Sequence, residues 1–128
     1  MEGLFKKVNY VSFMVSDWQR AKKFYGETLG LPVAAFISDE VGWMEFGEKD
    51  ATHLAINLWQ GPGELPPVGR GGIVIFSVPD AYAAVAELRK RGVKCEDVVG
   101  IPGMVTFADF YDPDGNLLEV AGPPPAGS

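Results

Sequence analysis

One structural pattern is written twice along this chain, over residues 8–30 and again over residues 74–92. Each copy has a short apolar run, an aspartate and a helical stretch that closes on a glycine. The two aspartates, Asp17 and Asp80, lie 63 positions apart. Two copies of one small unit can bury apolar faces that neither buries alone, so the duplication predicts two paired modules with any binding site at their seam.

The first module, at about residues 5–60, has the pattern of a βαβββ unit. β-Branched and apolar runs predict strands, helical spacing of apolar residues predicts a helix, and Gly30 supplies a stop. Ser16 stands three residues before Gln19, which is the spacing of a capping box. The strands are expected at residues 8–15, 32–38, 42–46 and 52–59, with the helix over 18–28.

The second module, at about residues 72–122, repeats this order after a linker at 61–71 that is rich in glycine and proline. Asp17 and Asp80 are interpreted as helix caps or first-turn residues. We expect the tail from residue 122 to be disordered. The second module's strands are expected at residues 73–78, 94–99, 104–111 and 117–121, with the helix over 80–91 and a turn at 112–116.

Length and composition exclude several functional classes. At 128 residues, with 47% hydrophobic and 22% charged residues, the chain predicts one globular domain over 1–128. A net charge of −6 without any basic run argues against nucleic-acid binding. No apolar run is long enough to span a membrane, and no leader pattern is present, so we expect a cytoplasmic protein. The single cysteine, Cys95, excludes an intramolecular disulfide.

The expected fold class is α+β, with both modules contributing to one cupped, eight-stranded mixed sheet whose helices cover the outer face. Strand alternation then sorts the side chains between the helix side and the concave side. The residues predicted on the concave side are Tyr10, Ser12, Met14, His53, Asn57, Trp59, Ile73, Ile75 and Glu119.

Three stretches resemble the vicinal-oxygen-chelate superfamily, which contains glyoxalase I, bleomycin-resistance proteins, fosfomycin-resistance enzymes and extradiol dioxygenases. They are Val15-Ser-Asp17 through Leu29-Gly30-Leu31, Val78-Pro-Asp80 through Gly92-Val93, and Asp112-Pro-Asp-Gly-Asn-Leu-Leu-Glu119. With the duplication, they cover nearly the whole chain. The resemblance implies the two-module fold and a homodimer, whereas the superfamily's chemistry is too varied for the fold to define it.

The resemblance also places up to four metal ligands, one on the first and one on the last strand of each module. Those places hold Tyr10, Asn57, Ile73 and Glu119 here. Only Glu119 is an ordinary ligand for a divalent cation, and a protein cage needs about three good donors. The usual metal site is therefore expected to be lost, and neither a metal nor another cofactor is expected.

Glu119 is the leading candidate for a functional residue, as a general base or as the partner of a cationic ligand. The alternative is a hydrated carboxylate, or one paired with a basic side chain. His53, the only histidine, is either a strand-end residue or a member of a relocated site with Glu45. Tyr10, Met14, Trp43, Trp59 and Phe110 can form an aromatic wall or ordinary core.

Two functions follow from these candidates. The first is a metal-free binding protein that captures an aromatic or cationic small molecule in a concave pocket. The second is a lyase, isomerase or dioxygenase, either with Glu119 as base or with a rearranged metal site of His53, Glu45 and Glu119. The replaced ligand positions and the aromatic residues favour the first.

Overall fold

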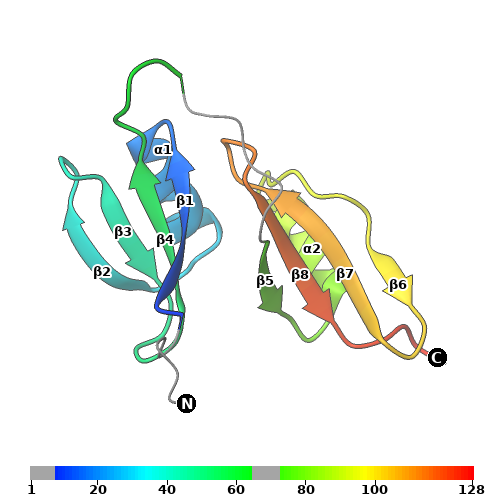
Figure 1. The fold of residues 1–128 in the computed structure, drawn as a ribbon. Helices are drawn as coiled ribbons and strands as arrows, with labels where there is room; N and C mark the ends of the chain where they lie inside the picture. Colours follow the sequence, from blue (N-terminus) through cyan, green and yellow to red (C-terminus); the bar gives the residue numbers. More distant parts are fainter. Residues whose placement is uncertain (1–7, 65–72) are drawn as a thin grey trace, which may run out of the picture. The chain divides into compact units, whose positions relative to one another are not determined.

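A computed structural model of the protein describes residues 8–64 and 73–128 (Figure 1). Most of the predicted linker at 61–71 and the first residues of each predicted module therefore lie outside the described residues. The chain divides into two compact units, Met1–Pro66 and Pro67–Ser128. Each unit contains a four-stranded mixed sheet with helix beside it, which confirms the α+β class and the repeated βαβββ order.

Unit 1 has its strands in the order β1-β4-β3-β2. The first and last strands, β1 and β4, pair in parallel, and the other two pairs are antiparallel. A parallel pair requires a long connection, which the helical segment and the two middle strands provide here. The elements are β1 (Tyr10–Val15), α1 (Trp18–Lys22), η1 (Lys23–Thr28), β2 (Val33–Ser38), β3 (Trp43–Phe46) and β4 (His53–Leu58).

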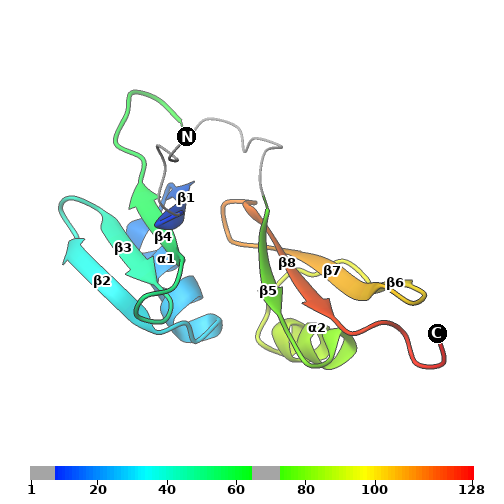
Figure 2. The same cartoon turned by 60° about the horizontal axis from the view of Figure 1, so that its bottom comes forward.

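Unit 2 repeats this topology with the order β5-β8-β7-β6, in which β5 and β8 are parallel. Figure 2 shows α2 lying against one face of this sheet. The elements are β5 (Val74–Ser77), α2 (Ala81–Lys90), β6 (Val99–Ile101), β7 (Val105–Tyr111) and β8 (Leu117–Gly122). No helix in residues 8–64 or 73–128 is long and apolar enough to cross a membrane.

The helices begin at the predicted aspartates and not at the predicted capping box. The Asp17 carboxylate accepts a hydrogen bond from the Arg20 backbone N–H at 3.1 Å, and Asp80 accepts from Tyr82 and Ala83 at 2.9 and 3.2 Å. Ser16 stands one residue too early, and its hydroxyl accepts from the Arg20 guanidinium. The capping-box prediction was therefore wrong, because the first helical residue is Trp18.

The core of each unit lies between the sheet and its helix. Strand β7 shows the alternation clearly, because Thr106, Ala108 and Phe110 are buried while the residues between them are only half-buried. Phe110 is 2% exposed and stacks on Phe76 with ring centroids 6.4 Å apart. Of the two readings of Phe110, an aromatic wall or ordinary core, the structure therefore supports the core.

Two further predictions in unit 2 need correction. Of the strand expected at 94–99, only Cys95 bridges to Phe110, and the regular strand is β6. The Arg89 guanidinium instead binds this stretch by donating to the Cys95 carbonyl and to Asp97. The tail is not disordered, because the Pro123 carbonyl accepts a hydrogen bond from the Thr106 hydroxyl at 2.8 Å.

Candidate functional site

The sheet face away from the helix, which we call the open face of each unit, carries the predicted ligand-binding residues. On β1, Tyr10 and Met14 are 46% and 41% exposed, whereas Val15 is fully buried on the helix side. On β5, Ile75 is 56% exposed, and Ile73 just before the strand is also exposed. The predicted strand alternation is therefore correct on both strands, and each unit leaves large apolar side chains on its open face.

Glu119 lies at the centre of the open face of unit 2. Its cross-strand neighbour on β7 is Asp109, and its neighbour on β5 is Ile75. The Asp109 Oδ1 atom is buried and has no hydrogen-bond partner within the described residues. Burial raises the pKa of Glu119, and a hydrogen bond with Asp109 and the charge of Asp109 raise it further. Two carboxyl groups in this position hold a proton between them more readily than either holds one alone.

Asp109 is the functional candidate that the sequence prediction missed. The sequence contains the signal, because Asp109 and Glu119 are equally far from Asp114 at the centre of the predicted turn. Counting outward from the turn in an antiparallel hairpin pairs them directly, as the structure does. One reading of the sequence paired Glu119 with a basic side chain, whereas the structure places a second acid, Asp109, opposite it.

The equivalent place in unit 1 is neutral. The Asn57 side-chain amide donates a hydrogen bond to the Ser12 hydroxyl on the parallel neighbouring strand. Met14 and Trp43 are the cross-strand neighbours of Asn57. Two of the predicted residues, Ser12 and Asn57, are thus in direct contact and satisfy each other.

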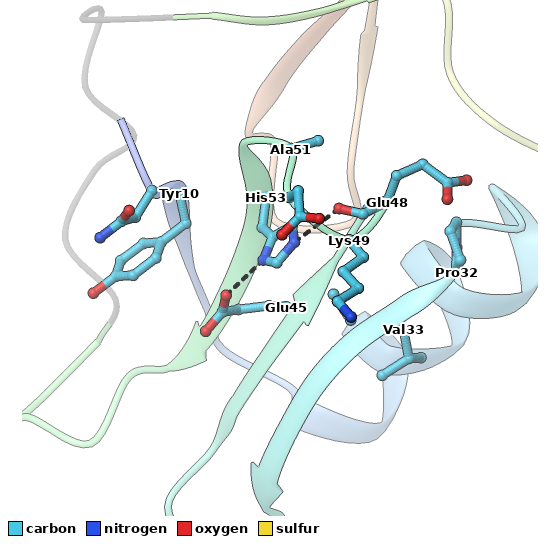
Figure 3. Close-up of a pocket in the computed structure, with 12 residues that line it drawn as sticks. Tyr10, Pro32, Val33, Glu45, Glu48, Lys49, Ala51 and His53 are labelled. Atoms are coloured by element: carbon cyan, nitrogen blue, oxygen red, sulfur yellow. Dashed lines mark hydrogen bonds and ion pairs between the residues drawn. The ribbon is translucent and has the colours of Figure 1, made fainter. Parts of the chain in front are cut away.

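A pocket of about 740 Å³ opens in unit 1 at the end of the sheet where β1 and β4 begin (Figure 3). Tyr10 and His53 are paired residues on these strands, and both line it. Twelve residues form the lining: Asn9, Tyr10, Pro32, Val33, Ala34, Glu45, Gly47, Glu48, Lys49, Asp50, Ala51 and His53.

Both carboxylate oxygens of Glu45, a charged group of this pocket, have hydrogen-bond partners. One carboxylate oxygen lies 2.8 Å from His53 Nδ1, and the other accepts the Trp43 indole N–H at 2.9 Å. These hydrogen bonds, that of Trp43 first, hold the pKa of Glu45 below its ordinary value. The other ring nitrogen of His53 lies 3.1 Å from the Glu48 carbonyl oxygen. Both His53 nitrogens thus face oxygen acceptors, which is the environment that suits an imidazolium.

Trp59 lies apart from this pocket, just beyond β4. Its ring packs over Gly61, where an added Cβ would come within 2.3 Å of the indole, and its N–H points to the Gly63 carbonyl at 3.4 Å. The indole therefore covers its own turn, in addition to the backbone bond that Trp59 makes with Val15.

The residues at the four places of the usual chelate do not fit a divalent metal. Asn57 uses its amide N–H to donate to Ser12, Ile73 has no donor atom and Tyr10 offers only a phenol, so Glu119 is the one ordinary metal ligand among the four places. Within the described part of the chain, no group of three or more His, Cys, Asp or Glu side chains is arranged to hold a metal ion. His53 and Glu45 do meet, but as partners of each other.

Residues 7–120 match the family described as Glyoxalase/Bleomycin resistance protein/Dioxygenase superfamily. The chain belongs to this superfamily. YaeR of Escherichia coli (strain K12), named as an uncharacterized protein, is 32% identical over 127 residues, covering 94% of this chain and 98% of YaeR.

Solved structures of similar proteins extend this relationship. TnmS3, described as an antibiotic binding protein from Streptomyces sp. CB03234, is 30% identical with a TM-score of 0.74, and the match covers 95% of this chain and 99% of TnmS3. A superfamily member from Sphaerobacter thermophilus DSM 20745 is 25% identical with a TM-score of 0.73, covering 94% of this chain and 99% of its own. The fold and the superfamily are thereby established.

Proposed function

We propose that this protein binds an aromatic or cationic small molecule on its open sheet faces without the help of a metal. The observation that carries the proposal is the Asp109–Glu119 carboxyl pair, which lies on an exposed sheet face beside apolar Ile75. A ligand cation beside the two carboxyl groups can neutralise their charge. The net charge of −6 attracts such a cation over longer distances.

The other predicted residues serve the proposal within their own units. On unit 2, Glu119 anchors the ligand through charge, and Ile73 and Ile75 provide apolar contacts. On unit 1, the open face offers a ligand aromatic, apolar and hydrogen-bonding contacts from Tyr10, Ser12, Met14, His53 and Asn57. The similarity to TnmS3, described as an antibiotic binding protein, supports a ligand of drug-like size.

A second candidate function is catalysis with Glu119 as a general acid or base, in a lyase or isomerase. The raised pKa of Glu119 favours it, because an acid–base group works best when it titrates near the working pH. The two functions differ in the fate of the ligand. A binding protein releases the ligand unchanged, whereas an enzyme converts it to a product. If Glu119 is the acid or base, the Glu119→Gln variant should no longer carry out this conversion.

The test uses two ligands of nearly the same shape, uncharged acridine and the cation N-methylacridinium, titrated calorimetrically at about pH 7.5 where acridine is neutral. We expect the wild-type protein to prefer the cation by about 5- to 10-fold and Glu119→Gln to lose the preference. Chromatography of the recovered ligands then separates binding from conversion. Equal affinity for both ligands in the wild type contradicts the proposal.

The homodimer implied by the family resemblance is part of the same proposal, since superfamily members often complete a pocket with a partner subunit. Light scattering during gel filtration measures the mass directly. A mass near twice 13.8 kDa is expected, and a monomer at all concentrations contradicts it.

A further inference from the structure

The pocket of unit 1 has a chemistry of its own, which does not involve Glu119. We infer that this pocket binds the ammonium group of a small organic amine, with Glu45 as the anchor and Tyr10 against the amine's apolar body. The inference goes beyond the proposed function, because it names a ligand chemistry at a second place, a pocket contained within unit 1.

Glu45 is suited to anchor an ammonium group because it is already ionised and held in place. Its two oxygens receive N–H donors from Trp43 and His53, at 2.9 and 2.8 Å. A carboxylate offers about four lone-pair sites, so these donors leave room for others. Since the side chain is fixed before the ligand arrives, binding an ammonium costs little ordering entropy.

The charges around the pocket also favour a cation. The lining includes three carboxylates, Glu45, Glu48 and Asp50, against Lys49 and His53, so the balance is negative even with His53 protonated. Lys49 is the group that could attract an anion instead. Its side chain is exposed and belongs to the turn between β3 and β4, so an anion would have to order it on binding.

The apolar part of the lining matches a ligand with one small ring or chain. Tyr10 is 46% exposed, so it offers surface that a ligand can cover. Tyr10 meets Trp43 edge to face at 5.1 Å between centroids, which limits its rotation. An aromatic face next to a carboxylate is a favourable environment for an ammonium ion. The volume of about 740 Å³ lies within the range of small-molecule pockets.

His53 is a positioning residue in this arrangement. Figure 3 shows its ring between the Glu45 carboxylate and the Glu48 backbone, to which it is joined at 2.8 and 3.1 Å. It therefore ties strand β3 to the turn that forms the pocket rim. Gly47 permits this close approach, because its φ is +133° and an added Cβ would lie 3.2 Å from the His53 ring.

The experiment compares two probes with the same phenylethyl body, 2-phenylethylamine and 3-phenylpropionate, by calorimetry with the full chain at neutral pH. We expect the amine to bind about 5- to 10-fold more tightly than the acid. Glu45→Gln should remove that preference. Tyr10→Leu should weaken binding of the amine while leaving the Glu45 carboxylate and its hydrogen-bond donors in place. Glu87→Gln, at an exposed carboxylate on α2 in unit 2, is the matched control and should change nothing.

Each other outcome overturns the inference. Tighter binding of the acid would identify Lys49 as the anchor, and undetectable binding of the amine up to about 10 mM would leave the pocket without this ligand class. A preference for the amine that survives Glu45→Gln and is lost in Glu119→Gln would move the site to unit 2. That last result would refute this inference and support the proposed function. Loss of the preference for the amine in Glu45→Gln alone would instead identify Glu45 as the anchor.

Discussion

The two units share one backbone plan and differ most at the centre of their open faces. Asn57 and Glu119, 62 residues apart, occupy the same place on the last strand of each unit. In unit 1 the amide is satisfied by the Ser12 hydroxyl, and its cross-strand neighbour is Trp43. In unit 2 the cross-strand neighbour is Asp109, so an acid faces an acid. Duplication thus preserved the scaffold while the polar chemistry diverged.

The carboxylates of the two open faces show the consequence. Glu45 receives N–H donors from Trp43 and His53, which lower its pKa. Glu119 is desolvated and faces Asp109, which raise its pKa. The same residue type is therefore kept ionised in one unit and made easier to protonate in the other. Both are proposed as anchors for a cation, but Glu45 is already ionised, whereas Glu119 binds a proton more readily.

The largest expected effect tests whether the cores of the two units contribute equally to the free energy of unfolding. Ile56 and Leu118 occupy equivalent, fully buried positions on β4 and β8. We expect Ile56→Ala and Leu118→Ala each to lower the free energy of unfolding by about 2–5 kcal/mol, because each leaves a cavity. Urea denaturation followed by circular dichroism measures both. A cost below about 1 kcal/mol for one of them would show that its unit is loosely packed.

Glu45→Gln is expected to cost about 1–2 kcal/mol at neutral pH, since an amide cannot accept from both Trp43 and His53. The effect should depend on pH. Because the folded-state pKa of Glu45 is lowered, its stabilisation is present above the ordinary glutamate pKa and is lost as the pH falls through the lowered value. Unfolding free energies measured from acidic to neutral pH should show this acid-side loss in the wild type and less of it in the variant.

The helix caps should contribute about 1 kcal/mol each, with Asp80→Ala costing more than Asp17→Ala. Asp80 accepts from two backbone N–H groups of a ten-residue helix, whereas Asp17 accepts from the Arg20 N–H of a five-residue helix. Ser16→Ala is the matched control, because its hydroxyl accepts from the Arg20 side chain and Asp17 is the N-cap. Equal losses for Ser16→Ala and Asp17→Ala in thermal unfolding would contradict the cap assignment.

The smallest expected effect has the opposite sign. Because the folded-state pKa of Glu119 is raised, the wild type is favoured below the ordinary glutamate pKa and loses that advantage as the pH rises through the raised value. At about pH 8 Glu119→Gln should therefore stabilise the protein, by less than about 1 kcal/mol, which is the range for cross-strand charge pairs. Destabilisation of Glu119→Gln at that pH would show that the carboxylate has a favourable partner.

Much of the fold follows from local sequence signals. The duplicated aspartates identified both helix starts, and period-two alternation placed Tyr10 and Ile75 on exposed faces. Ser16 competed with Asp17 for the cap, and pattern alone does not decide between adjacent capping residues. The tail was misread because Pro123 is bound through its carbonyl oxygen, a backbone group that composition does not reveal.

The site was less predictable, because it depends on contacts across strands. The sequence left Phe110 either in an aromatic wall or in the core, and its burial and its stacking on Phe76 decide for the core. To predict that Asp109 lies opposite Glu119, one needs the register of β7 with β8. To predict the hydrogen bond from Trp43 to Glu45, one needs the side-chain conformations on β3. The sequence left open a relocated site of His53 with Glu45, and the structure brings these two side chains together as partners of each other.

The central claim is that a cationic ligand binds beside Asp109 and Glu119 and displaces the proton that Glu119, with its raised pKa, binds more readily than an ordinary glutamate. Calorimetric titration with N-methylacridinium at about pH 5.5, in two buffers of different ionisation enthalpy, counts the protons released on binding. We predict net proton release for the wild type and none for Glu119→Gln. Binding of the cation without proton release by the wild type would contradict the account.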